Sequence, residues 1–112
     1  MLYEVLDLDN KGERWKVHFK DEGNWLLGVW IPEFSSREEV SYLERHEKPE
    51  LFLLLKGKIV MLLSEDGKNI KEVELESGKP LVVYGWHNGY RVGEGEALVV
   101  EWDGNTTEYL EV

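Results

Sequence analysis

Residues 44–57 read ERHEKPELFLLLKG, and this stretch decides the fold. Glu44 and His46 are two residues apart, so their side chains face the same side if this segment is a strand. A Lys-Pro corner follows, and an apolar run begins at Glu50 and ends in a turn at Gly57. The stretch therefore predicts two strands joined by a corner, with an imidazole and two carboxylates gathered around it.

The rest of the chain shows the same pattern of a short apolar run followed by turn residues. Alternation is cleanest in residues 14–20, where Trp15, Val17 and Phe19 are expected on one side of a strand. Residues 35–39 carry a capping-box pattern, which predicts at most one helical turn. We expect an all-β barrel or sandwich. Its strand-like segments are 1–9, 14–20, 25–31, 42–46, 50–55, 58–63, 69–75, 81–84, 90–92, 97–102 and 106–112.

Composition limits the classes of function. The chain has 112 residues, with 13 Lys and Arg against 23 Asp and Glu, which gives a net charge of −10. One domain over residues 1–112 is expected at this length. Nucleic acid and anionic membranes are excluded as partners, since both need a basic surface. There is no Cys and no signal peptide, which predicts a cytoplasmic protein. The absence of Gln and the abundance of Glu and Lys are habits of thermophiles.

The spacing in residues 44–57 resembles the first motif of the cupin superfamily, G-x5-H-x-H-x3,4-E-x6-G. His46, Glu50 and Gly57 match its second His, its Glu and its last Gly, while Glu44 stands where the motif has its first His. The second motif, G-x5-P-x-G-x2-H-x3-N, is matched at Gly78 and at the metal-binding His, which falls on His87. Counted from that glycine, Tyr84 occupies the Pro position, and Asn88 follows the histidine directly.

The cupin resemblance implies a jelly-roll barrel, also called a double-stranded β-helix, whose ligands point into the lumen. His46, Glu50 and His87 form a two-histidine, one-carboxylate donor set, and Glu44 is a fourth candidate. Such a set suits Fe, Mn, Ni or Zn. A bound ion could act as a Lewis acid on a small oxygenated substrate, and an isomerase or dioxygenase reaction is consistent with the resemblance.

Four aromatic residues near these positions are candidates for lining the mouth of a ligand site, and they suit a flat or sugar-like molecule: Phe52, Tyr84, Trp86 and Tyr90. Two other readings stay open. The barrel could hold a sugar-like or other small ligand without metal, or it could serve dimerisation alone. In those cases His46 is a residue of a charged surface loop, and His87 is a turn residue packed against its neighbour.

Tryptophan is abundant for so small a domain, with five residues. Trp15, Trp25, Trp30 and Trp102 are expected to fill the core or a subunit interface, where aromatic residues are enriched. Residues 25–31, WLLGVWI, are apolar on both faces of a strand, so both faces should be covered. We therefore expect a homodimer.

Overall fold

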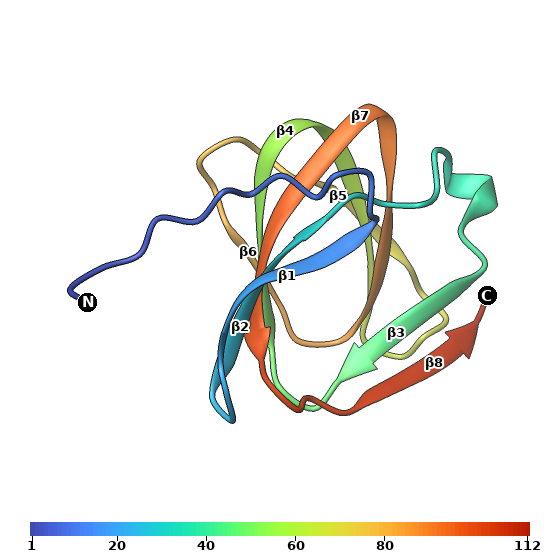
Figure 1. Cartoon of the computed structure of the whole chain (residues 1–112). Helices are drawn as coiled ribbons and strands as arrows, with labels where there is room; N and C mark the ends of the chain where they lie inside the picture. The colour runs from blue at the N-terminus through green and yellow to red at the C-terminus, as the bar shows by residue number, and fades with distance from the viewer.

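The computed structural model describes residues 1–112 as a curled sheet of eight strands with one short 3-10 turn (Figure 1). All strand pairs are antiparallel, which fits the alternating patterns of the sequence. The all-β expectation is confirmed. The strands are β1 (Trp15–Asp21), β2 (Trp25–Trp30), β3 (Tyr42–His46), β4 (Glu50–Ser64), β5 (Lys71–Glu74), β6 (Leu81–Val83), β7 (Trp86–Trp102) and β8 (Thr107–Glu111), and the turn η1 spans Arg37–Glu39.

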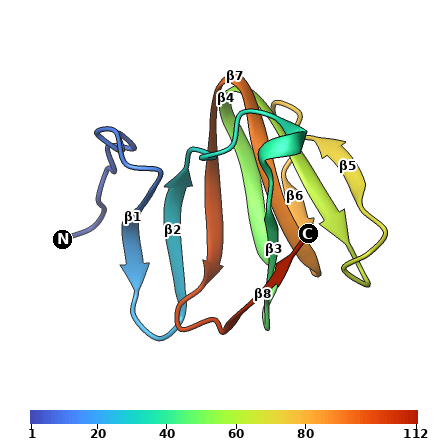
Figure 2. The same ribbon diagram turned by 90° about the vertical axis from the view of Figure 1, so that its right-hand side faces the viewer.

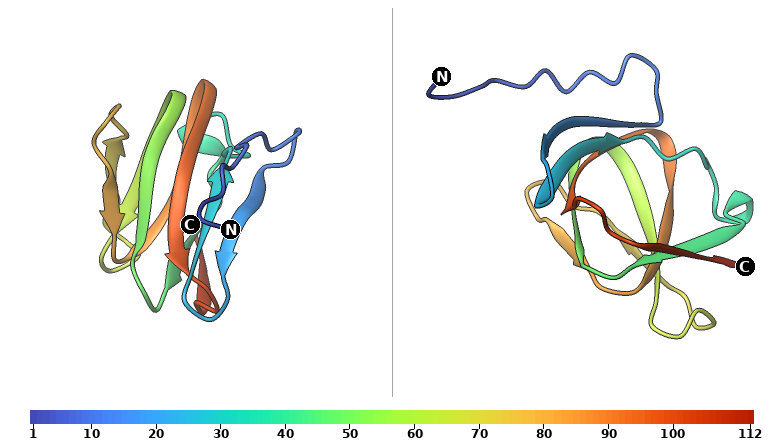
Figure 3. Two further views of the ribbon diagram at one scale, coloured as in Figure 1. Left: turned by 60° about the vertical axis from the view of Figure 1, so that its left-hand side comes forward. Right: turned by 60° about the horizontal axis from the view of Figure 1, so that its bottom comes forward.

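The strands wrap around a common interior. They follow the order β1-β2-β7-β3-β8, and β4 joins this path by pairing with β7, while β5 and β6 pair with β4. Figure 2 shows β1 and β2 on one side and β5 and β6 on the other. The right-hand view of Figure 3 looks into the resulting barrel. Both β4 and β7 bend from one side of the barrel to the other, so they connect its two halves.

The structure corrects the boundaries expected in the middle of the chain. The turn expected at Gly57 is a bend inside one long strand, β4, and the separate strands expected at 90–92 and 97–102 are both parts of β7. Gly57 has a φ of 75°, and a Cβ there would collide with the carbonyl group of Glu94 in β7. A glycine therefore allows β4 to bend while it stays paired with β7.

Two apolar clusters pack along the long strands. The first is built from β4 and β7, with Ile59, Met61 and Val99 at most 2% exposed. The second joins β3 to β4 through Leu43 and Leu62, both fully buried. Met61 and Leu62 are consecutive in β4, so the two clusters lie on opposite faces of this strand.

A bulge in β1 changes which residues face the interior. Trp15 and Val17 pair with Trp30 and Gly28 of β2, but the register shifts before Phe19, which pairs with Leu27. The expectation that Trp15, Val17 and Phe19 share one face is therefore wrong, because the extra residue of a bulge reverses the alternation. Phe19 lies on the outer face of the sheet.

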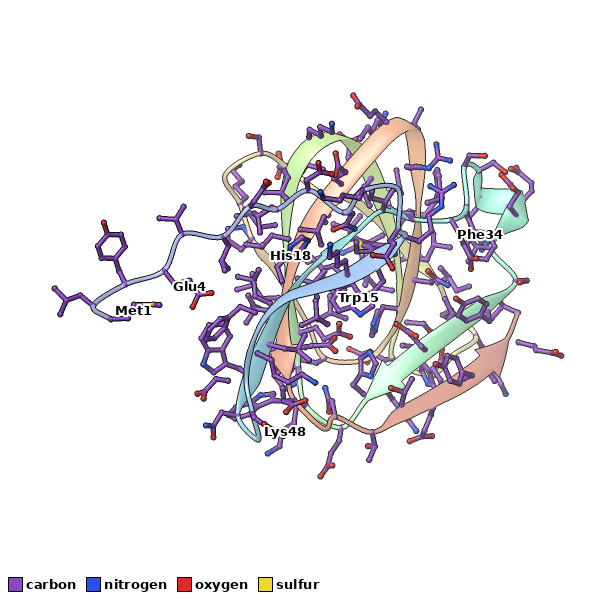
Figure 4. All side chains as sticks on the ribbon, viewed as in Figure 1. Met1, Glu4, Trp15, His18, Phe34 and Lys48 are labelled. Atoms are coloured by element: carbon purple, nitrogen blue, oxygen red, sulfur yellow. The ribbon has the colours of Figure 1, made fainter.

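The first nine residues form no strand, contrary to expectation. They leave the barrel as an extended arm, and Met1 and Glu4 stand clear of the body (Figure 4). The arm is anchored at Asn10, which is 2% exposed and donates through its side-chain amide to the carbonyl of Val29 at 2.9 Å. No helix of this protein is long enough and apolar enough to cross a membrane.

Candidate metal centre

Three strands bring four donor side chains to one point. Glu44 and His46 project together from β3, Glu50 is the first residue of β4, and His87 is the second residue of β7. Glu44 and His87 are direct partners in the β3–β7 ladder. Antiparallel pairing places such side chains on the same face, so the sheet itself juxtaposes a carboxylate and an imidazole.

The corner between β3 and β4 lets Glu50 return to the side chains of β3. Asn105 clamps this corner, because its side-chain oxygen accepts from the Lys48 amide at 3.0 Å and its amide donates to the Lys48 carbonyl at 3.1 Å. The four-residue step from His46 to Glu50 therefore follows a corner whose shape is fixed by these hydrogen bonds. The side chains on either side of the bend lie within 2.6 Å of each other.

The donor atoms crowd around Glu50. Its Oε1 lies 2.6 Å from His46 Nε2 and 2.8 Å from His87 Nε2. Glu44 Oε1 lies 3.6 Å and 3.7 Å from the same two nitrogens. All four donor atoms fall within 4.8 Å of one another. A divalent ion about 2.0–2.2 Å from each donor fits a group of this size.

The closest contacts in the cluster join Glu50 to the two imidazoles. Glu50 Oε1 and His87 Nε2 are both buried and have no hydrogen-bond partner, although they are 2.8 Å apart. A divalent cation bound between these atoms would take both as ligands, with the imidazole proton kept on the other ring nitrogen.

The outer nitrogens of both imidazoles are held by acceptors. His87 Nδ1 lies 2.9 Å from the Gly85 carbonyl, and His46 Nδ1 lies 3.3 Å from the Thr106 carbonyl and 2.9 Å from the Thr107 hydroxyl. A carbonyl can only accept, so Nδ1 carries the proton. In the neutral rings, Nε2 then presents its lone pair to the cluster, which is the arrangement that metal-binding histidines use.

Mutual attraction shifts the pKa values of the cluster. Burial lowers the pKa of both imidazoles, but the neighbouring carboxylates outweigh burial and raise it to about 10 for His46 and about 9 for His87. Burial raises the pKa of Glu44 and Glu50, but the two imidazoles bring it to about 2 for Glu44 and well below its usual range for Glu50. At neutral pH and without metal, two imidazolium groups therefore balance two carboxylates.

The cluster forms part of the wall of a cavity of about 320 Å³. The other walls are largely aromatic and carry no Lys or Arg. Phe52 lies in this wall, as expected. Sequence reasoning did not assign Trp15, Trp30, Tyr42, Tyr109 or Glu101 to it. The full lining is Trp15, Trp30, Tyr42, Glu44, His46, Glu50, Phe52, His87, Asn88, Val99, Glu101 and Tyr109.

Three of the expected aromatic residues are not part of the wall of this cavity. Tyr84 precedes β7 and is 78% exposed. Trp86 points into the second apolar cluster, and the guanidinium of Arg45 lies 4.4 Å from the centre of its ring. Tyr90 packs at the edge of that cluster and donates from its hydroxyl to Glu72 at 3.1 Å. These residues are close to His87 in sequence, but Tyr84 lies before β7, and Trp86 and Tyr90 project from the face of β7 opposite to His87.

Glu101 is the most informative residue that sequence reasoning missed. It lies in β7 two residues after the buried Val99, so alternation directs both side chains inward. A lone carboxylate in the otherwise apolar run LVVEW was the available signal. Burial, and then the charge of Glu50 beside it, raise the pKa of Glu101 to about 8. Glu101 therefore keeps a proton at neutral pH.

Solved structures with a similar fold include one named as a cupin. A cupin-2 domain protein from Shewanella frigidimarina has a TM-score of 0.60 and 14% identity, over 81% of this chain and 83% of its own. Hydroxypropylphosphonic acid epoxidase from S. wedmorenis, in complex with fosfomycin, has a TM-score of 0.63 and 19% identity, over 80% of this chain. A protein from Neisseria meningitidis has a TM-score of 0.64 and 11% identity, over 89% of this chain and all of its own, 100%.

The chain spans about half the length of the epoxidase, 49% of it. That enzyme has also been solved with Co(II) and with Fe(II). No protein-family model matches the chain, and no curated protein does. The likeness to solved structures shows the fold: this chain is a cupin-type jelly-roll barrel, as the resemblance of residues 44–57 implied. The cluster of two imidazoles and two carboxylates fits a divalent metal.

Proposed function

We propose that this protein binds one divalent metal ion through His46, Glu50 and His87, with Glu44 as a fourth donor. The observation that carries the proposal is the convergence of four donor atoms, contributed by three strands, within 4.8 Å of one another. Nitrogen and oxygen donors in this ratio suit Fe, Mn, Ni or Zn. A cavity kept for a ligand without metal would not need four donor atoms within 4.8 Å.

Charge balance supports a divalent ion over a monovalent one. Without metal, the cluster holds a proton on each imidazole, because the pKa values of His46 and His87 are raised to about 10 and about 9. A divalent ion that displaces these two protons leaves the net charge of the site unchanged. Binding therefore releases two protons near neutral pH, and affinity rises as the pH rises.

The cavity beside the cluster supports a small, uncharged polar ligand. Its aromatic walls include Trp15, Trp30 and Phe52, and no Lys or Arg is present to attract an anion. Aromatic faces with a few polar groups suit the alternating apolar and hydroxyl surfaces of a sugar-like molecule. When bound, the metal ion supplies a Lewis acid for an oxygen of that ligand. Glu101, protonated at neutral pH, can donate a hydrogen bond to the Glu50 carboxylate beside it.

Metal analysis of untagged protein tests the proposal. Protein reconstituted separately with Fe(II), Mn(II), Ni(II) and Zn(II) should retain close to one equivalent of at least one ion after desalting. His46→Ala should lower the affinity for that ion at least about 100-fold, since it removes a ligand whose ring is already oriented. The matched control is His18→Ala, because His18 lies on β1 and contacts Asn10 instead of the cluster. If none of the four ions is retained, or if both variants bind equally well, the proposal is wrong.

A further inference from the structure

The C-terminal strand holds the strand that carries two of the four donors. All five residues of β3 have a partner in β8, whereas only Glu44 has a partner in β7. The strand β8 pairs with no other strand and ends the sheet. Figure 1 shows β3 and β8 side by side at the edge of the barrel. The positions of Glu44 and His46 therefore depend more on β8 than on β7.

The register of this ladder places Thr107 against the centre. His46 lies opposite Thr107, and Glu44 lies opposite Tyr109. Directly opposite residues share a face, so Thr107 and Tyr109 lie on the side of the sheet that carries the donors. The Thr107 hydroxyl lies 2.9 Å from His46 Nδ1, and the Thr106 carbonyl lies 3.3 Å from the same nitrogen. The shorter of these two contacts comes from a side chain, so one substitution can remove it.

The Thr107 hydroxyl fixes which edge of the His46 ring faces the cluster. It accepts a hydrogen bond from Nδ1, which leaves Nε2 to face Glu50 Oε1 at 2.6 Å. A ring turned over about its bond to Cβ would present the carbon Cε1 there, and carbon is no metal ligand. His87 needs no such side chain, because the Gly85 carbonyl holds its Nδ1. His46 is therefore the imidazole whose orientation depends on a side chain of β8.

The segment that leads into β8 holds a third donor. Asn105 bonds the main-chain amide and carbonyl of Lys48, and so fixes the corner after which Glu50 begins β4. At the other end of the strand, the Val112 amide donates to the Ser41 carbonyl at 3.0 Å. The pairing of β8 is thus closed by hydrogen bonds at both ends. Three of the four donors take their places from this C-terminal segment.

We infer that the C-terminal strand positions the metal centre, with Thr107 as the positioning residue for His46. The inference rests on the proposed function, since it describes how the chain holds the donors of that site. Loss of an outer partner that orients a ligand lowers metal affinity by about 10- to 100-fold. The coupling is reciprocal, because an ion that binds more tightly when β8 is in place also holds β8 in place.

Metal titration of three variants tests the inference, with each of Fe(II), Mn(II), Ni(II) and Zn(II) that the wild type retains. Thr107→Val keeps the shape of the side chain but removes the hydroxyl, so the dissociation constant should rise about 10- to 100-fold. Thr107→Ser keeps the hydroxyl and should bind as the wild type does. The matched control is Glu108→Leu, which removes a hydrogen bond of 2.8 Å from Arg45 between the same two strands but on the opposite face. It should leave the affinity unchanged.

The proton on His46 Nδ1 gives a second readout that needs no metal. In NMR spectra of the metal-free protein it should be observed in the wild type, in Thr107→Ser and in Glu108→Leu. In Thr107→Val it should be lost through exchange with water, since the hydroxyl no longer holds it. Near-ultraviolet circular dichroism shows whether Thr107→Val is folded, and Thr107→Ala serves as a second variant if it is not. Amide hydrogen exchange in β8 should slow when the ion binds.

Each outcome decides the inference. Equal affinity in Thr107→Val and the wild type would overturn it, and so would an equal loss in Thr107→Val and Glu108→Leu, since weaker strand pairing would then explain both. Failure of Thr107→Ser to restore binding, or exchange in β8 that the ion does not slow, would also overturn it. A wild type that retains no ion counts against the proposed function. The Nδ1 proton would then decide alone, because its loss in Thr107→Val supports the role of Thr107 and its persistence refutes it.

Discussion

Glu50 is buried at the middle of the candidate centre. It is 4% exposed, and one of its oxygens lies within 2.8 Å of two imidazole nitrogens. The next residue in β4, Leu51, points to the outer face. One step along the strand thus separates the cavity from the apolar surface outside. Glu50→Gln keeps the size of the side chain but removes the charge and replaces one acceptor oxygen with an NH2 donor.

Stability of the metal-free protein should fall as the pH rises. The folded-state pKa values of His46 and His87 are raised to about 10 and about 9, so their contribution is fully present below the ordinary value of about 6.5 and is lost toward pH 10. Glu101, with its pKa raised to about 8, adds to the loss. The free energy of unfolding in urea, with a chelator present, should drop by several kcal/mol between pH 6.5 and pH 9.

Metal binding should show the opposite dependence in the same window. Two protons leave when the ion binds, so affinity should rise roughly 100-fold per pH unit between pH 6.5 and pH 8.5. Isothermal titration at several pH values measures this slope. A metal-free stability that stays level from pH 6.5 to pH 9 would contradict the raised pKa values of the imidazoles.

The gathering of the four candidate donors could be predicted from the sequence, but most of the cavity wall could not. His46 and Glu50 lie four residues apart around a single corner, so local spacing was enough to bring them together. Trp15 and Trp30 reach the cavity only because β1 pairs with β2. Such pairing depends on contacts between distant parts of the chain, which spacing does not encode. Tyr84 illustrates the converse, since it is three residues from His87 and yet points into water.

At the scale of elements, sequence reasoning divided each of the two long strands, β4 and β7, into shorter strands. Glycine near the middle of an apolar run reads as a turn, and Gly57 was interpreted in that way. In the structure this glycine lies at a bend between two halves of β4, and both halves pair with β7. A turn and a sharp bend need the same left-handed backbone, so the residue type alone cannot distinguish them.

Alanine at the bend should be much more costly than alanine at an ordinary turn. Gly57 and Gly78 share a φ of 75°, but only at Gly57 would a Cβ collide with backbone, whereas nothing lies within 4 Å at Gly78. Gly78→Ala should therefore cost about 1 kcal/mol of unfolding free energy, from the left-handed conformation alone. Gly57→Ala should cost about 3 kcal/mol or more, because β4 or β7 must also shift. Equal losses in urea unfolding would show that the contact with Glu94 does not constrain the bend.

At the scale of the whole molecule, bound metal should raise the melting temperature. An ion that binds only the folded state adds about 2.7 kcal/mol when its concentration is 100 times its dissociation constant. For a domain of this size that corresponds to roughly 10 °C. Scanning calorimetry with and without a chelator measures the shift. His46→Ala should abolish it, while His18→Ala should keep it, and an equal shift in both variants would place the ion elsewhere.

The fold class was predictable because the signals that indicate it are local. Alternation and turn residues are local, and they recur along the whole chain, so an all-β barrel followed from many weak signals that agree. The arm at residues 1–9 was the exception. Its apolar residues alternate like a strand, but no strand of the same chain pairs with it. Heat tolerance, a cytoplasmic location and an isomerase or dioxygenase reaction stay predictions.

The pairing of β2 with β7 has a consequence for synthesis of the protein in the cell. Trp25 lies opposite Trp102, so the central ladder joins residues near the two ends of the chain. Closing such a loop is slow, because its entropy is lost before any contact forms. A ribosome must therefore release residue 102 before β2 can pair with β7, although β1 is available to it earlier. Until then the apolar strand WLLGVW is exposed on the nascent chain, where chaperones bind such segments.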